Sequence, residues 1–233
     1  MYQKYIKRIL DIICALAALI VFGWVYIIAA IAVRVKLGSP VLFKQPRPGI
    51  KDKNGNETVF CLWKFRTMTD ERNSDGTLKS DEERLVPFGA KLRDWSLDEL
   101  PEAINILKGE MSVVGPRPQL VRDMVFMTDE QRKRHNIRPG LTGLAQVRGR
   151  NAISWEKKLS SDLEYIENIT FLGDLKIVIK TVTDVFSHDG ITEDGEATAT
   201  DFGDYLLADG KITAEEYKKK QLEAKKILEK AGF

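Results

Sequence analysis

One apolar run dominates the pattern of hydrophobic and polar positions. Residues 12–33 carry no charge over 22 positions, a length that suits membrane insertion. Basic residues flank the run on both sides: Lys4, Lys7 and Arg8 before it, Arg34 and Lys36 after it. The positive-inside rule therefore assigns no orientation to a simple crossing. A re-entrant hairpin would return both flanks to one membrane surface, with Gly23 as the local residue for the break, whereas the cost of unpaired backbone groups in lipid favours an unbroken span.

Short β-rich stretches follow the apolar run. Residues 41–43 predict a strand that leads into the turn-rich Lys44–Gly49. Asn54-Gly55 predicts a hairpin turn, and residues 58–65 predict the strand after it. Further on, the apolar run Leu144–Val147 is predicted as another short strand. The pattern therefore predicts a small hairpin rather than a large sheet.

Helical signals fill most of the remaining chain. A proline in the first turn predicts helices that begin at Pro87 and near Pro101. Apolar residues at helical spacing predict amphipathic helices over residues 155–168 and 171–186. A Thr-x-x-Glu capping box predicts a last helix that starts at Thr213.

Composition and charge set limits on the function. The 233 residues include 36 Lys and Arg against 34 Asp and Glu, a formal net charge of +2, so any anion-binding character must come from local clustering. Cys14 and Cys61 lie far apart, which indicates neither a disulfide framework nor a zinc site. A catalytic cysteine is disfavoured because neither His135 nor His188 stands at a recognisable partner spacing.

The stretch Ser96-Leu97-Asp98-Glu99-Leu100-Pro101 carries the strongest candidate chemistry. Asp98 and Glu99 stand at the expected start of a helix, where unpaired amides stabilise an ionised carboxylate or a bound phosphate. This placement suits a nucleophile beside an anionic substrate. The spacing of Ser96 and Glu99 is also that of a plain capping box. The motif alone therefore leaves capping and phosphoryl transfer open.

Basic side chains around this stretch are candidates for anion binding. Lys64 and Arg66 share one face of a predicted strand, and Arg93 closely precedes the acidic pair. Arg117 stands between two prolines that pre-organise it for bidentate contact with phosphate, although a structural salt bridge would give the same pattern. Residues 117–150 hold eight Lys or Arg against three acids and are predicted to form an anion-facing surface. No aromatic ladder accompanies them, so nucleic acid is not an expected partner.

Several motifs, taken in order, resemble those of a known family. They are Lys7-Arg8 with Asp11, Trp63–Met68, Ser96–Pro101, Lys108–Pro118, Arg138–Gly149 and Asn151–Trp155. The set is similar to the bacterial sugar transferases, and more narrowly to the small monotopic phosphoglycosyl transferases of the PglC type, from Met1 to roughly Phe202. The resemblance implies transfer of a sugar 1-phosphate from a UDP-sugar to a polyprenyl phosphate such as undecaprenyl phosphate. UMP would be released, and magnesium is the implied cofactor.

The same resemblance implies roles for individual residues. The family's Asp-Glu pair falls on Asp98 and Glu99, so Asp98 is expected to form a covalent phosphosugar-aspartate intermediate and Glu99 to help activate the acceptor. Magnesium is assigned first to Asp98 and second to Glu99. The expected phosphate-binding residues are Arg93, Arg117 and Arg150, and the further substrate-binding candidates are Lys64, Arg66 and Gln146.

The membrane segment departs from the family pattern, because Gly23-Trp24 stands where family members usually have a Ser-Pro pair. The resemblance still favours a re-entrant helix in the bacterial inner membrane, with the active site on the cytoplasmic face. The expected fold is α+β and monotopic, with a re-entrant N-terminal helix, a small β-hairpin and several amphipathic helices. The expected parts are a membrane-inserted segment (1–38), a cytosolic catalytic domain (39–189), a linker (190–210) and a C-terminal helix (211–233).

Two other functions stay open at this point. One is a membrane-anchored anion-binding scaffold in which Asp98 and Glu99 only cap a helix. The other is a nucleotide-sugar hydrolase, in which water replaces the lipid acceptor. By resemblance the first expected donors are UDP-N-acetylhexosamines and diacetamido sugars, and the sequence leaves self-association into a homo-oligomer undecided.

Overall fold

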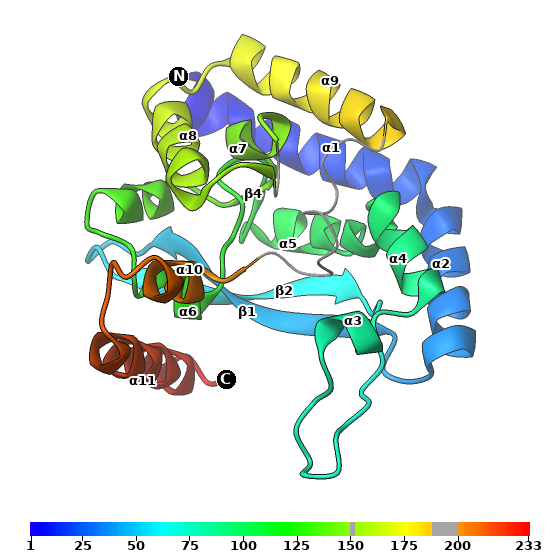
Figure 1. Ribbon diagram of the computed structural model, residues 1–233. Coiled ribbons are helices and arrows are strands. Elements are labelled where there is room, and N and C mark those ends of the chain that lie inside the picture. The colour runs from blue at the N-terminus through cyan, green and yellow to red at the C-terminus, as the bar shows by residue number, and fades with distance from the viewer. Residues whose placement is uncertain (150–151, 188–199) are drawn as a thin grey trace.

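The computed structural model describes residues 1–149, 152–187 and 200–233. The N-terminal half contains η1 (Tyr2–Ile6), α1 (Lys7–Val21), α2 (Gly23–Leu37), β1 (Leu42–Lys51), β2 (Glu57–Phe65), α3 (Asp81–Arg84), α4 (Pro87–Asp94), η2 (Leu97–Glu99) and α5 (Glu102–Lys108). The C-terminal half contains β3 (Ser112–Val114), α6 (Val121–Met124), η3 (Gln131–Asn136), β4 (Gly140–Thr142), α7 (Leu144–Val147), α8 (Trp155–Glu167), α9 (Phe171–Ser187), α10 (Phe202–Ala208) and α11 (Ala214–Lys230). Helices surround two small sheets (Figure 1), which agrees with the predicted α+β class.

The predicted hairpin is the antiparallel pair β1 and β2. Its turn has Gly55 at a φ of 84°, the left-handed region that glycine adopts without strain. Strand β1 runs on through Lys44–Gly49, where a turn-rich loop was predicted. Pro46 and Pro48 have no N–H group to donate to a neighbouring strand. They are tolerated because alternate residues of a strand direct their backbone nitrogens to the same side, which here is the open edge of a two-stranded sheet.

A second small sheet, which was not predicted, precedes the predicted short strand at Leu144–Val147. Strand β4 pairs in parallel with β3, and Leu144–Val147, predicted as a strand, forms helix α7. A run of four apolar residues does not by itself distinguish a strand from a helix. The backbones of β4 and of the residues after β3 approach closely, since a Cβ at Gly140 would lie only 2.1 Å from the backbone nitrogen of Gly115.

The apolar run forms two helices that meet at a bend. Helices α1 and α2 diverge by 65° at Phe22, directly before Gly23, where the break was expected. Within the described residues, no single helix is long and apolar enough to cross a membrane, although this bent pair passes the length and composition test together. The pair is compatible with the predicted re-entrant segment.

Polar contacts tie α1 to the rest of the protein. The buried carboxylate of Asp11 accepts hydrogen bonds from the Ser112 hydroxyl and the Val113 amide, at 2.9 and 2.8 Å. Arg8 donates to the carbonyl oxygens of Ile106 and Leu107 at the end of α5. Figure 1 shows α9 beside α1, where Lys7 pairs with Asp174 at 2.5 Å.

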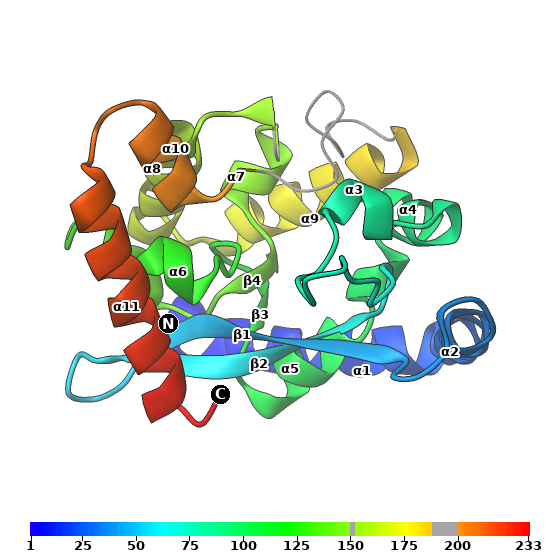
Figure 2. The ribbon, with the colours of Figure 1, turned by 60° about the horizontal axis from the view of Figure 1, so that its bottom comes forward.

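The C-terminal helices pack on the molecule. The capping box of α11 is present as predicted, since Thr213 and Glu216 exchange hydrogen bonds, and α11 lies against α6 (Figure 2). Helix α10 occupies part of the stretch predicted as a linker, because Phe202 is buried with Met127 and Trp155. Residues 190–199 of the predicted linker lie outside the described residues, and the division into domains stays a prediction.

Candidate active site

The acidic motif lies in the short 3-10 turn η2, directly before α5. Ser96 adopts a left-handed conformation with φ 52°, and its side chain makes no capping hydrogen bond to η2. Instead the Glu99 amide donates to the Ser96 carbonyl oxygen at 3.3 Å. The capping-box interpretation of Ser96 and Glu99 is therefore wrong, because the left-handed residue turns the chain without using its hydroxyl group. Helix α5 follows Pro101 as predicted.

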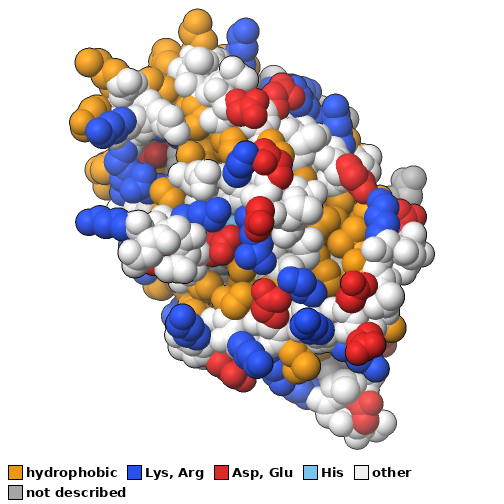
Figure 3. Space-filling view, turned by 90° about the vertical axis from the view of Figure 1, so that its left-hand side faces the viewer, with side chains coloured by type: hydrophobic (Ala, Val, Ile, Leu, Met, Phe, Trp, Pro, Cys, Tyr) orange, Lys and Arg blue, Asp and Glu red, His pale blue; other side chains and the backbone are white. Residues whose placement is uncertain are grey.

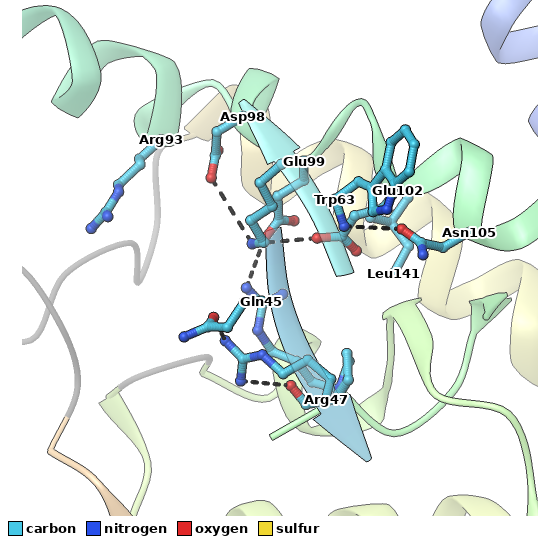
Figure 4. Close-up of polar contacts among 12 residues, drawn as sticks. Gln45, Arg47, Trp63, Arg93, Asp98, Glu99, Glu102, Asn105 and Leu141 are labelled. Carbon is cyan, nitrogen blue, oxygen red and sulfur yellow. Dashed lines mark hydrogen bonds and ion pairs between the residues drawn. The ribbon is translucent and has the colours of Figure 1, made fainter. Parts of the chain in front are cut away.

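Lys64, at the end of β2, is the shared cation of the acidic cluster. Its Nζ lies 2.6 Å from Glu99 Oε1, 3.3 Å from Glu102 Oε1 and 3.9 Å from Asp98 Oδ2. Arg117 contacts the same oxygen, with Nη2 also 2.6 Å from Glu99 Oε1. Figure 4 shows the three carboxylates converging on this point from η2 and α5. Glu99 is thus held by two cations, while Asp98 lies farthest from Lys64.

Glu102 is the member of the cluster that the sequence interpretation missed. Its side chain is almost fully buried, and it stands three and four residues after the predicted pair, a spacing that brings side chains together on a helical turn. That spacing was the available signal. Asn105, one turn further, donates to the Cys61 carbonyl oxygen and accepts from the Trp63 amide, which fixes α5 against β2.

Burial and charge set the ionisation of these groups differently. Desolvation raises the pKa of Asp98, with Lys64 acting against it, and desolvation raises the pKa of Glu102 to about 7. For Glu99 burial also acts to raise the pKa, but Arg117 and Lys64 outweigh it and hold the pKa well below its usual range. At neutral pH Glu99 is therefore ionised and acts as a fixed anion between two cations.

Arg93 and Arg66, two other predicted substrate-binding residues, make contacts outside the acidic cluster. Arg93 donates through Nε to the Thr67 hydroxyl at 3.1 Å, and Figure 4 shows it on the Asp98 side of the cluster with its guanidinium group pointing away from the carboxylate. Arg66 is turned away toward the end of α2, where it bonds the carbonyl oxygens of Leu37 and Ser39 and pairs with Asp70.

Gln146, in α7, donates to the carbonyl oxygen of Leu141, in β4. Arg150 lies outside the described residues. The structure therefore joins Lys64 and Arg117 to the acidic pair and places Arg93 near it, while the substrate-binding roles of all six residues stay predictions.

The basic residues between 117 and 150 do not form the predicted anion-facing surface. Most are engaged by acids or carbonyl groups of the protein: Arg122 with Asp201, Arg132 with Glu57, Lys133 with Glu130, Arg134 with Asp162, Arg138 with the Gly109 carbonyl, and Arg148 with Glu164. Figure 3, which faces the end of the molecule that carries α8 and α11, shows positive and negative side chains interspersed. The local charge count missed most of these pairs because Glu57, Asp162, Glu164 and Asp201 lie outside residues 117–150, whereas Glu130 was part of the count.

The carboxylates fit a magnesium ion that takes most of its ligands from substrate and water. Among the residues that the structure describes, no three His, Cys, Asp or Glu side chains form a metal-holding group. Mg²⁺ typically uses one or two carboxylates together with substrate phosphates. Asp98 suits such a site, whereas Glu99 Oε1 already faces Lys64 and Arg117. Asp98 is accordingly the first candidate ligand and Glu99 the second.

Comparison with known proteins identifies the family. The model of a family described as bacterial sugar transferase matches residues 2–188. The chain belongs to the bacterial sugar transferase family. Residues 189–233, including α10 and α11, follow the matched part of this bacterial sugar transferase.

Relatives from several bacteria match most of the chain. The "Uncharacterized sugar transferase EpsL" of Bacillus subtilis (strain 168) is 46% identical over 197 residues, which cover 84% of this chain and 95% of EpsL. A "UDP-glucose:undecaprenyl-phosphate glucose-1-phosphate transferase" of Caulobacter vibrioides is 33% identical over 193 residues, or 78% of this sugar transferase and 70% of the relative. The protein of the same name from Escherichia coli (strain K12) is 35% identical over 190 residues, which are 77% of this chain but only 40% of that longer protein.

Proposed function

We propose that the protein transfers a sugar 1-phosphate from a UDP-sugar to a polyprenyl phosphate such as undecaprenyl phosphate, with release of UMP. The observation that carries the proposal is the buried acidic cluster, in which Glu99 is clamped by Lys64 and Arg117 next to the less tightly paired Asp98. Phosphoryl transfer depends mainly on positioning and on neutralising the phosphate charge. The names of the Caulobacter and Escherichia relatives, which specify UDP-glucose and undecaprenyl phosphate, support these substrate classes.

Asp98 is the proposed nucleophile. Its carboxylate oxygen attacks the β-phosphorus of the UDP-sugar, the bond from that phosphorus to the oxygen bridging the two phosphates breaks, and UMP leaves with this oxygen. An oxygen of the polyprenyl phosphate then attacks the same phosphorus. The bond to Asp98 breaks, the carboxylate is restored, and the product is a polyprenyl diphosphate sugar.

The other residues hold charge and orientation in this scheme. Glu99 keeps Lys64 and Arg117 in place and assists the incoming acceptor, while Arg93, Arg117 and Lys64 contact phosphate oxygens. Asp98, with Glu99 second, would hold Mg²⁺, which when bound neutralises phosphate charge. Burial favours the scheme because electrostatic interactions are stronger where water is excluded.

The proposed location is the cytoplasmic face of the bacterial inner membrane, with α1 and α2 as a re-entrant pair. The support is the 65° bend between the helices together with exposed apolar side chains such as Ile20, Trp24 and Ile27. Such side chains are costly to leave in water and cheap to place in lipid. A lipid-linked acceptor would meet the active site at this surface.

The test is UMP release by the purified protein with undecaprenyl phosphate, Mg²⁺ and a panel of UDP-sugars. UDP-glucose comes first because the relatives' names specify it, followed by UDP-N-acetylhexosamines and UDP-diacetamido sugars. Asp98→Asn is expected to abolish release, whereas the exposed control Asp129→Asn retains it. With donor alone, the peptide that contains Asp98 should gain the mass of a phosphosugar.

Each alternative function gives a different result in this assay. Full turnover by Asp98→Asn would refute the assigned nucleophile. UMP and free sugar phosphate formed without acceptor would support a nucleotide-sugar hydrolase. No UMP from any donor, combined with anion binding that weakens steeply with salt, would support a scaffold.

A further inference from the structure

Two other arginines donate hydrogen bonds to backbone carbonyl groups of the segment that carries Arg117. Arg134, in η3, donates from Nη2 to the carbonyl oxygen of Arg117 at 2.6 Å. Arg47, in β1, donates from Nη1 to the carbonyl oxygen of Pro118 at 3.0 Å. These two carbonyl groups are consecutive in the chain. Side chains from two separate elements therefore orient the peptide planes on both sides of Pro118.

Little other freedom remains in this segment. Pro116 and Pro118 fix their own φ angles, and a residue that precedes a proline is restricted to extended conformations. The Gly115 amide donates to the Thr142 carbonyl oxygen at 2.8 Å, which ties the start of the segment to β4. The direction of the Arg117 side chain, whose Nη2 reaches Glu99 at 2.6 Å, thus depends on how its own carbonyl group is held.

Arg134 is itself fixed by a buried ion pair with Asp162 on α8. Arg134 Nε and Nη2 lie 3.0 and 2.7 Å from Asp162 Oδ2, and the two side chains are only 1% and 2% exposed. Desolvation offsets most of the attraction in such pairs, so they contribute little net stability compared with apolar side chains of similar size. Asp162 Oδ1 is moreover buried without a hydrogen-bond partner among the described residues. Stability alone does not account for this pair, whereas orientation of the Arg117 carbonyl group does.

We infer that Arg134, oriented by Asp162, and Arg47 are positioning residues that aim Arg117 at the phosphate groups of the substrate. The inference rests on the proposed function, in which Arg117 contacts phosphate. Arg134 and Arg47 act through the backbone of the Arg117 segment and are not catalytic residues. Because the peptide groups are fixed before substrate arrives, little ordering is left for the moment of reaction.

The test is a mutant cycle in the full-length protein. The paired change Arg134→Gln with Asp162→Asn removes both charges together, so no buried charge is left alone. In the presence of Arg117 it is expected to lower kcat/KM for the UDP-sugar by about 10- to 100-fold, the effect of a shift of about 1 Å. In a protein that already carries Arg117→Ala, the same paired change is expected to lower kcat/KM by less than about twofold further, because effects that act through one shared residue are not additive. Arg47→Gln is expected to follow the same pattern.

The matched control is another buried pair that does not contact this segment. Lys7 and Asp174 lie 2.5 Å apart with side chains 11% and 8% exposed. Any decrease in kcat/KM caused by Lys7→Gln with Asp174→Asn is expected to be the same in the presence of Arg117 and in the Arg117→Ala background. An equal loss for the Arg134–Asp162 change in both backgrounds would show a general structural effect and overturn the inference.

Hydrogen exchange separates this inference from the proposed function, since it needs no activity. Backbone amides in residues 115–121 are expected to exchange faster in the Arg134–Asp162 variant than in the wild-type protein or the Lys7–Asp174 variant. If the wild-type protein releases no UMP but this difference is present, the proposed function fails and the positioning role stands. If the wild-type protein is active and exchange of residues 115–121 is unchanged, the positioning role fails.

Discussion

Glu102→Gln is expected to stabilise the protein above neutral pH and to leave it nearly unchanged at low pH. Burial raises the pKa of Glu102 from 4.5 to about 7, and Lys64, 3.3 Å away, only partly opposes this effect. Between pH 4.5 and about 7, Glu102 keeps its proton in the folded protein but releases it in the unfolded chain. The free energy of unfolding therefore falls as the pH rises from 4.5 through 7.

The size of the effect follows from the two pKa values. One pKa unit corresponds to about 1.4 kcal/mol, so the ionised carboxylate costs the folded state about 3 kcal/mol above pH 7. Glutamine has nearly the same shape and never ionises. The stability advantage of Glu102→Gln is thus expected to be close to zero near pH 4.5 and to approach about 3 kcal/mol at pH 8.

The assay is urea unfolding of both proteins in the same detergent at a series of pH values. Only the difference between the two unfolding free energies is used, so titrating groups that do not interact with Glu102 cancel. Glu164→Gln is the sign control: Arg148 lowers the pKa of Glu164 below 4.5, so the stability that this carboxylate contributes is complete above pH 4.5, and the variant should be less stable than wild type there by an amount that does not change with pH. A difference for Glu102→Gln that stays constant with pH, or a variant less stable than wild type at pH 8, would refute the reasoning.

Three further predictions follow from the same contacts. Lys64→Met leaves buried carboxylates without their shared cation and is expected to lower the unfolding free energy by about 3 to 5 kcal/mol in a denaturant titration; unchanged stability would contradict the role of Lys64. Gly89→Ala places a Cβ 1.9 Å from the Thr67 carbonyl oxygen and is expected to cost about 1 to 3 kcal/mol, whereas Gly23→Ala, with nothing within 4 Å, should not be destabilising. Chelation of divalent cations is expected to stop UMP release by the wild-type protein, and Mg²⁺ should restore it; turnover in excess chelator would remove magnesium from the proposal.

Features encoded within a few residues were predicted correctly. The Asn54-Gly55 turn, the start of α5 after Pro101 and the capping box at Thr213 each depend on one local backbone preference. The break beside Gly23 was also placed correctly, although its 65° angle was not predicted. Local chemistry was sufficient for these features because no distant residue competes with it.

Features that depend on distant partners were missed. Leu144–Val147 was predicted as a strand, but the pairing of β3 with β4 places the strand earlier. The basic residues between 117 and 150 were predicted to face an anion, but acids such as Asp162 and Glu164 engage them. A charge count along the chain cannot include acids that only folding brings near.

The sequence by itself determined that Asp98 and Glu99 stand together before a helix and that their motif is that of a bacterial sugar transferase. Only the tertiary structure decided which carboxylate is clamped, because Lys64 and Arg117 reach Glu99 from β2 and from the loop after β3. It also brought in Glu102 as a buried third carboxylate and turned Arg134 toward the backbone of Arg117. The physical reason is that ionisation and orientation depend on burial and on charges within a few ångströms, and these distances are set by packing rather than by position in the chain.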